Sequence, residues 1–235
     1  MADAKRPKLQ NVMTCKGIAQ WPKLTSPDTK WSPDGEYKVG VILPAEKAAD
    51  IVTALEEARK KVYQETKAML QENISQLKGE KLAKAKKALN DITLGELPCK
   101  PVFDEEGNET GDVVLNFKMK AQRKDKKSGS VVQMAPKLFD ASGQPLPKGI
   151  EIWGGSTIKV AGQINPYYIP GTNTAGAGLR LSAVQVIALR TSGGGDAASF
   201  GFGKEDGYTA PKSAGEEEGF SDESGDDDGD ECPDF

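Results

Sequence analysis

The chain has 235 residues, with 31 Lys and Arg against 35 Asp and Glu, and a formal net charge of -4 at pH 7. Its three widely spaced cysteines argue against a disulfide framework, and the complete absence of histidine removes the commonest general base and metal ligand, which argues against an enzyme. No apolar run is long enough to span a bilayer and no apolar signal region follows the basic start, so we expect a soluble, cytoplasmic protein.

The negative charge is concentrated at the C-terminal end. Residues 216–235 contain eleven carboxylates, no Lys or Arg, and a terminal phenylalanine. Subtracting those eleven acids leaves 24 acids against 31 basic residues, so the rest of the chain has a charge of +7. A cationic body with an anionic tail is expected where the tail competes with a polyanionic ligand such as nucleic acid. The alternative is a tail that only improves solubility.

The first half of the chain predicts strands followed by a long helix. Residues 11–21 predict one strand, and residues 36–43, rich in β-branched side chains and stopped by Pro44, predict a buried strand. After Pro44, helical spacing of apolar residues predicts an amphipathic helix over 46–72. Its apolar stripe comprises Ala48, Ile51, Val52, Leu55, Ala58, Val62 and Met69. A weaker helix over 74–89 is interrupted by Gly79, and its lysines are typical of a solvated surface.

The second half predicts short strands. Over 113–122, odd positions are apolar, and even positions from Asn116 onward are polar or cationic, which predicts a strand with a cationic outer side. A basic turn over 123–129 and a strand over 131–138 complete a hairpin, and Asp-x-x-Gly segments at Asp104 and Asp140 predict type I turns. Further strands are expected over 156–164 and 179–189, the last with a β-bulge or with both faces buried, because its apolar parity changes.

These elements predict a mainly β domain with an inserted helix. We expect a five- to six-stranded antiparallel barrel of the OB-fold type, packed by one long helix, over residues 1–192, with the helical insertion at about 45–90. From residue 193 onward the chain is Gly-rich and then acidic, and it has too little apolar content to order itself. We therefore expect a flexible tail over 193–235.

The candidate binding residues are aromatic side chains interleaved with cations, a combination suited to single strands because bases stack on rings while cations track phosphates. The candidates are Tyr167, Tyr168, Trp31, Lys38, Lys118, Lys120, Arg123, Lys126, Lys127, Lys159 and Arg180. The alternative for each tyrosine is a half-buried barrel residue with a hydrogen-bonded hydroxyl. Trp153, before Gly154 and Gly155, is expected in the core.

Other ligand motifs fail in this sequence. The glycine clusters near residues 193–195 and 201–203 lack the Lys-Ser/Thr that follows a phosphate loop. The acidic run at 226–231 lacks the glutamate that closes a calcium loop, because Phe235 stands at that position. We therefore expect no cofactor and no dedicated metal site.

From Gly35 almost to Leu189, the sequence resembles the replicative single-stranded DNA-binding proteins of tailed bacteriophages. The resemblance rests on Gly35-Glu36-Tyr37-Lys38-Val39 leading through Ile42-Leu43-Pro44, on Asp125-Lys126-Lys127, on Gly154-Gly155-Ser156 with Lys159-Val160, on Pro166-Tyr167, and on the acidic end Asp234-Phe235. The chain departs from the family in a longer loop over 169–178, and in Asp34, which stands where a cation would help binding.

The resemblance implies an OB-fold that binds single-stranded DNA without sequence preference in phage replication, and in recombination and repair, within the cytoplasm of the infected bacterium. It also implies that Tyr167 stacks on bases and that the tail, through Asp234 and Phe235, docks on the phage DNA polymerase and helicase-primase. A homodimer is left open. The residues themselves leave two rival interpretations, an acidic-tailed protein–protein adaptor and an RNA-binding barrel, since stacking and phosphate contacts do not read the sugar.

We also hypothesise that the tail occupies the basic groove until DNA displaces its carboxylates, which frees Phe235 for partners.

Overall fold

The computed structural model describes residues 9–30, 32–125 and 128–190. Contacts divide the chain into a unit of residues 1–193 and a unit of residues 194–235, and the described residues all belong to the first unit. The predicted tail over 193–235 lies outside the described residues.

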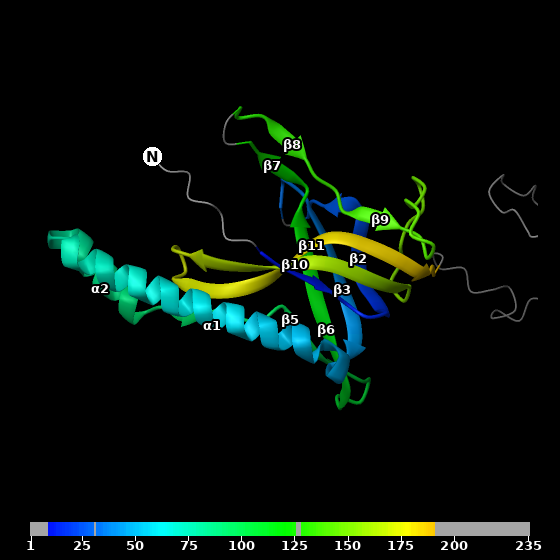
Figure 1. Ribbon diagram of the computed structural model, residues 1–235, viewed down its shortest axis with the longest axis horizontal. Coiled ribbons are helices and arrows are strands. Elements are labelled where there is room, and N and C mark those ends of the chain that lie inside the picture. The colour runs from blue at the N-terminus through cyan, green and yellow to red at the C-terminus, as the bar shows by residue number, and fades with distance from the viewer. Residues whose placement is uncertain (1–8, 31, 126–127, 191–235) are drawn as a thin grey trace, which may run out of the picture. The chain divides into compact units, whose positions relative to one another are not determined.

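Five strands close into a ring (Figure 1). In ring order they are β2 (Gly17–Asp28), β3 (Glu36–Pro44), β6 (Glu109–Lys120), β11 (Thr174–Ala188) and β10 (Thr157–Ile169), which pairs again with β2. All neighbours are antiparallel except β6 and β11, which are parallel. A small five-stranded barrel of this kind is an OB-fold. The predicted fold class is therefore confirmed, with one parallel pair that hairpin connections alone did not predict.

Short strands surround this ring. They are β1 (Gln10–Met13) beside β10, β5 (Cys99–Phe103) beside β6, β4 (Thr93–Leu94) and β9 (Lys137–Phe139) beside β11, and the separate hairpin of β7 (Gln122–Lys124) and β8 (Val131–Gln133).

Two predicted strands are each divided in the structure. The strand expected over 11–21 becomes β1 and β2, because the buried Thr14 leaves the ladder and exchanges hydrogen bonds with the backbone of Val160 on β10. The strand expected over 131–138 becomes β8 and β9, separated by a segment that contains Pro136, which has no N–H to donate to a ladder. The hairpin itself is confirmed, since β7 and β8 pair antiparallel.

The prediction of a long loop over 169–178 is also wrong. β10 continues to Ile169 and β11 begins at Thr174, with pairing from Asn165 opposite Gly178 to Ile169 opposite Thr174. Most of this segment is therefore an extension of the hairpin beyond the barrel.

The change of parity in the last strand is a β-bulge, as predicted. Pairing passes from Ala161 opposite Ala183 to Gly162 opposite Leu181, so Ser182 is the extra residue on β11. Side chains on both sides of the bulge reach the core, because one inserted residue reverses which parity faces inward.

The core lies inside the ring, where alternate side chains meet. Its largest fully buried members include Phe117, Leu43, Leu115, Ile158, Ile164 and Leu181. Gly162 makes room for Phe117, since a Cβ on this glycine would lie 2.9 Å from the phenylalanine ring. Both alternating patterns predicted for β6 and β10 are confirmed by this burial.

The helical insertion is α1 (Ala45–Gln76) followed by α2 (Gly79–Asn90). Figure 1 shows α1 leaving the barrel and running beside the outer part of the β10–β11 hairpin. Ala48, Ile51 and Leu55 are buried against the core, but Met69 is 47% exposed. The predicted stripe is therefore fully buried only near the barrel, and farther along α1 its members are partly buried or exposed.

Both predicted Asp-x-x-Gly turns are confirmed. In each, the glycine N–H donates to the aspartate carbonyl oxygen, and Gly107 and Gly143 have positive φ angles. The backbone N–H of Asn108 donates to the carboxylate of Asp104, which lowers the pKa of that group. The hydroxyl of Ser142 donates to Asp140 and lowers its pKa in the same way.

Candidate nucleic-acid interface

A row of basic side chains crosses four neighbouring strands on the outside of the barrel. The strand registers place Lys23 opposite Lys38, Lys38 opposite Lys118, and Arg180 beside Lys118. We call these four residues the cationic row. Like charges directly opposite one another destabilise a sheet, so folding alone does not explain the row.

Two carboxylates neutralise the middle of the cationic row. The ammonium of Lys38 lies 2.7 Å from Asp28, and that of Lys118 lies 3.7 Å from Glu36. The hydrogen bond from Lys38 lowers the pKa of Asp28, so this carboxylate stays ionised well into the acid range. Both pairs are partly exposed to solvent and can exchange their partners for a ligand's phosphate groups.

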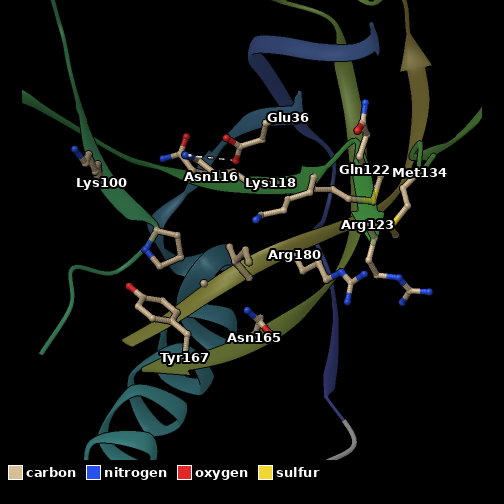
Figure 2. A pocket seen from close by; sticks show the side chains of 15 residues that line it. Glu36, Lys100, Asn116, Lys118, Gln122, Arg123, Met134, Asn165, Tyr167 and Arg180 are labelled. Atoms are coloured by element: carbon tan, nitrogen blue, oxygen red, sulfur yellow. Dashed lines mark ion pairs between the residues drawn. The ribbon is translucent and has the colours of Figure 1, made fainter. Parts of the chain in front are cut away.

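Next to the row, the outer surfaces of β6 and β11 border a hollow of about 750 Å³. Among the described residues that line it, Glu36 is the only acid, against five cations: Lys100, Lys118, Lys120, Arg123 and Arg180. The alternation of β6 points Lys118 and Lys120 outward, while Phe117 and Met119 fill the core. Figure 2 shows the guanidinium groups of Arg123 and Arg180 close together on one side of this hollow and Tyr167 on the other. We call it the tyrosine groove.

Tyr167 lies over a strip of glycine backbone. It is paired with Gly176 on β11, and a Cβ on that glycine would lie 2.5 Å from the ring and hydroxyl of the tyrosine. A Cβ on Gly95 would lie 2.8 Å from the same hydroxyl. The glycines thus create the space that this half-buried ring occupies at the edge of the groove.

Tyr168 has a different role. Its hydroxyl donates to the side-chain oxygen of Asn173, 2.7 Å away, and the amide of Asn173 donates to the carbonyl oxygen of Ala88 in α2. The tyrosine therefore ties the tip of the β10–β11 hairpin to the helical insertion. It is absent from the residues that line the tyrosine groove.

The structure brings together only part of the predicted site. Tyr167, Lys118, Lys120, Arg123 and Arg180 line one groove, and the cationic row adds Lys38. Lys159 lies elsewhere, in a separate hollow with Met13 and Phe139. The remaining candidates lie outside the described residues: Trp31, Lys126, Lys127, Asp234 and Phe235.

Two exposed tryptophans were not predicted. Trp153, expected in the core, is 43% exposed, because Ile152 takes the buried position before the turn that leads into β10. Trp21, at the end of the strand predicted over 11–21, is 77% exposed on β2. The adjacent Pro22 has no N–H to donate to a strand ladder. This proline is the sequence feature that indicates an irregular backbone at Trp21.

Neither helix of the described chain combines the length and the apolar run that crossing a bilayer requires. Within the described ranges, no group of His, Cys, Asp or Glu side chains is arranged to hold a metal ion.

The ring of strands and its cationic groove define an OB-fold barrel with the type of outer surface that such barrels use for oligonucleotides. A family model described as the single-stranded DNA-binding protein of bacteriophage T7 matches residues 17–189, and the chain belongs to this family. The membership confirms the family resemblance read from the sequence, and it confirms that the protein is not an enzyme.

Individual relatives agree with the family. The chain is 29% identical to the single-stranded DNA-binding protein of Escherichia phage T7 over 203 residues, which cover 84% of this chain and 81% of the relative. It is 32% identical to the corresponding protein of Enterobacteria phage T3 over 114 residues, or 48% of each chain. The crystal structure of gp2.5, a single-stranded DNA-binding protein of bacteriophage T7, superimposes with a TM-score of 0.61 at 23% identity, covering 87% of this chain and all of gp2.5. That likeness supports the fold.

Proposed function

We propose that the tyrosine groove and the cationic row bind single-stranded DNA without sequence preference during phage DNA replication, and in recombination and repair. The observation that carries the proposal is the cationic row, in which Lys38, Lys118 and Arg180 lie on neighbouring strands and are only partly neutralised by Asp28 and Glu36. A polyanionic strand removes the repulsion that remains. Counterion release from the strand then drives binding.

In this mechanism the bases and the phosphates use different side chains. A base stacks on Tyr167, a contact worth about 1–3 kcal/mol that any base can make. Phosphates contact Lys118, Arg180 and Arg123, whose charges carry no sequence information. The glycine strip under Tyr167 holds the ring in place before DNA arrives, which reduces the entropy lost on binding.

The test is a titration of the full chain against labelled oligo-dT, followed by fluorescence anisotropy. We expect binding to oligo-dT and to mixed single strands with similar affinity, weaker binding to duplex DNA, and a steep fall in affinity as salt rises. A matched oligo-rU series separates DNA binding from RNA binding. Equal affinity for duplex and single strands, or a flat salt response, would overturn the proposal.

The acidic tail is the regulatory part of the proposal. Its eleven carboxylates between residues 216 and 235 compete with DNA phosphates for the cationic groove, and displaced tails recruit the phage polymerase and helicase-primase through Asp234 and Phe235. The charge of +7 on the rest of the chain supports this competition.

Removing residues 216–235 separates the two roles of the tail. We expect tighter binding to oligo-dT and loss of association with the polymerase, whereas Phe235→Ala should lose the association and leave DNA affinity close to that of the full chain. Weaker or unchanged DNA binding after the deletion would contradict the competition.

A further inference from the structure

β2 carries a bulge centred on Trp21. Pairing passes from Gln20 opposite Gly40 to Lys23 opposite Lys38, so Trp21 and Pro22 are together accommodated opposite one residue of β3. Trp21 has a φ of 49°, a left-handed conformation that strains the backbone of a bulky residue. Bulges redirect side chains, and this one leaves the indole 77% exposed.

Trp153 is held beside the same strand by backbone hydrogen bonds. The N–H of Gly155 donates to the carbonyl oxygen of Ala19 at 2.8 Å, and the N–H of Ala19 donates to the carbonyl oxygen of Ser156 at the same distance. Trp153 and Trp21 both border a hollow of about 560 Å³. We call it the tryptophan hollow.

A third hollow shares lining residues with both the tryptophan hollow and the tyrosine groove. It has a volume of about 260 Å³ and is lined by Trp21 and Lys38 at one end, which also line the tryptophan hollow. It is lined at the other end by Asn116 and Lys118, which also line the tyrosine groove. The cationic row follows the same course from Lys23 on β2 to Arg180 on β11.

We propose that Trp21 and Trp153 form a second base-stacking subsite, which holds bases of the same DNA strand that stacks on Tyr167. The inference rests on the proposed function of the groove. Two large exposed rings that border one hollow are expected at a binding surface, and single-strand binders use such rings as stacking platforms. Lys23 and Lys38 line the hollow as well, together with Asp28, which lies 2.7 Å from the ammonium of Lys38. Two cations against one carboxylate therefore lie next to the rings. This excess of positive charge and the lining residues shared with the tyrosine groove favour a nucleotide over a neutral apolar partner.

Trp21→Gly tests the subsite without unfolding the barrel. Glycine accepts the positive φ without strain, so the unfolding temperature should stay the same or rise, while the affinity for a long oligo-dT should fall roughly 5- to 150-fold, the range for loss of one stacked base. Trp153→Ala should weaken binding similarly, and Trp153→Phe should restore most of it. The matched control is Phe103→Ala, which removes a 54% exposed ring on β5 that lines none of the three hollows.

The length of the DNA separates this inference from the function on which it rests. In a dT series from about 4 to about 16 nucleotides, the range of site sizes for OB-folds, Trp21→Gly and the unmodified chain should bind the shortest strands alike and diverge as length increases. If the full chain binds no oligo-dT, the proposed function fails. If it binds normally and both tryptophan variants match it at every length, only the second subsite is overturned.

Fluorescence provides a direct readout of contact. The chain has three tryptophans, so in a Trp31→Phe background all indole emission comes from the two residues of the tryptophan hollow. We expect oligo-dT to quench this emission in step with binding measured by anisotropy. Binding without quenching, or quenching that depends on residues 216–235 instead of DNA, would overturn the subsite and assign the hollow to another occupant.

Discussion

The barrel groove and the second helix are both rich in lysine, yet their lysines are arranged differently. On α2, Lys81, Lys84, Lys86 and Lys87 occupy a helix with no buried residue. In the cationic row, Lys38, Lys118 and Arg180 are aligned by strand register and border hollows, and Lys118 and Arg180 line the tyrosine groove together with Tyr167. The helix carries a solvated surface, as the sequence predicted, whereas the sheet aligns its cations at the spacing of neighbouring strands. The two regions carry similar numbers of cations. The alignment of the cations distinguishes the binding surface of the barrel from the solvated surface of the helix.

The largest expected effect comes from reversing charge in the cationic row. Lys118→Glu combined with Arg180→Glu should weaken oligo-dT binding by at least about 100-fold, since each charged contact is worth about 1.5–3 kcal/mol. It should also flatten the salt dependence, because fewer counterions are released.

The matched control is the double reversal Lys84→Glu and Lys87→Glu on α2, which changes the net charge by the same amount. Its binding should fall only a few-fold, through long-range electrostatics. An equal loss in both double variants would mean that net charge alone determines the affinity.

The adjacent tyrosines sharpen the same comparison. Tyr167→Ala should weaken oligo-dT binding roughly 5- to 150-fold by loss of stacking, and Tyr167→Phe should bind nearly as well as the unmodified chain. Tyr168→Ala should instead lower the unfolding temperature, because its hydrogen bond to Asn173 is lost. Anisotropy and thermal unfolding should be measured for all three variants. Similar behaviour of the two alanine variants in both measurements would contradict the different roles assigned to Tyr167 and Tyr168.

A smaller effect, an increase in the affinity for oligo-dT, is expected from a substitution at Glu36. Glu36→Gln removes the carboxylate that lies 3.7 Å from Lys118 and keeps the shape of the side chain. Oligo-dT affinity should increase about two- to five-fold, because exposed pairs are worth up to about 1 kcal/mol and the freed ammonium can contact phosphate. An unchanged affinity with an unchanged salt slope would show that Lys118 does not contact the strand.

The smallest effect concerns the pH dependence of stability. Because the pKa of Asp28 is lowered in the folded protein, its ion pair with Lys38 stabilises the fold above the unfolded pKa of 3.8, and this contribution is lost as the pH falls through the folded pKa. Asp28→Asn should therefore be less stable at neutral pH. Its unfolding temperature should also decline less steeply than that of the unmodified chain between about pH 5 and about pH 2. Parallel curves of unfolding temperature against pH for Asp28→Asn and the unmodified chain would contradict a role for the Asp28–Lys38 pair in stability.

The fold was predictable largely from local patterns. The alternation over 113–121 indicated which residues of β6 enter the core, and the change of parity after Ala183 indicated either a bulge in β11 or burial on both faces, of which the structure shows the bulge. Both signals are local because adjacent strand residues always point to opposite sides of a sheet. The divisions at Thr14 and before β9 were missed, because they depend on hydrogen bonds to distant strands or on a break within an otherwise strand-like run.

The candidate site was only partly predictable. Residue type and spacing selected Tyr167, Lys118 and Arg180, since cations and rings at the ends of strands are already visible in the sequence. Residue type alone also selected Lys159, which the barrel places in another hollow. It assigned Trp153 to the core, because a tryptophan in isolation is more often buried than exposed.

The sequence by itself determined the approximate positions of the barrel strands, the long helix, the separation of charge between residues 1–215 and 216–235, and the lack of histidine chemistry, because each is a property of consecutive residues. Only the tertiary structure decided that Lys23, Lys38, Lys118 and Arg180 form one row, and that Trp21 is turned outward next to Trp153. Closing the barrel sets the register between strands that are far apart in the chain, and that register is a consequence of packing the whole core.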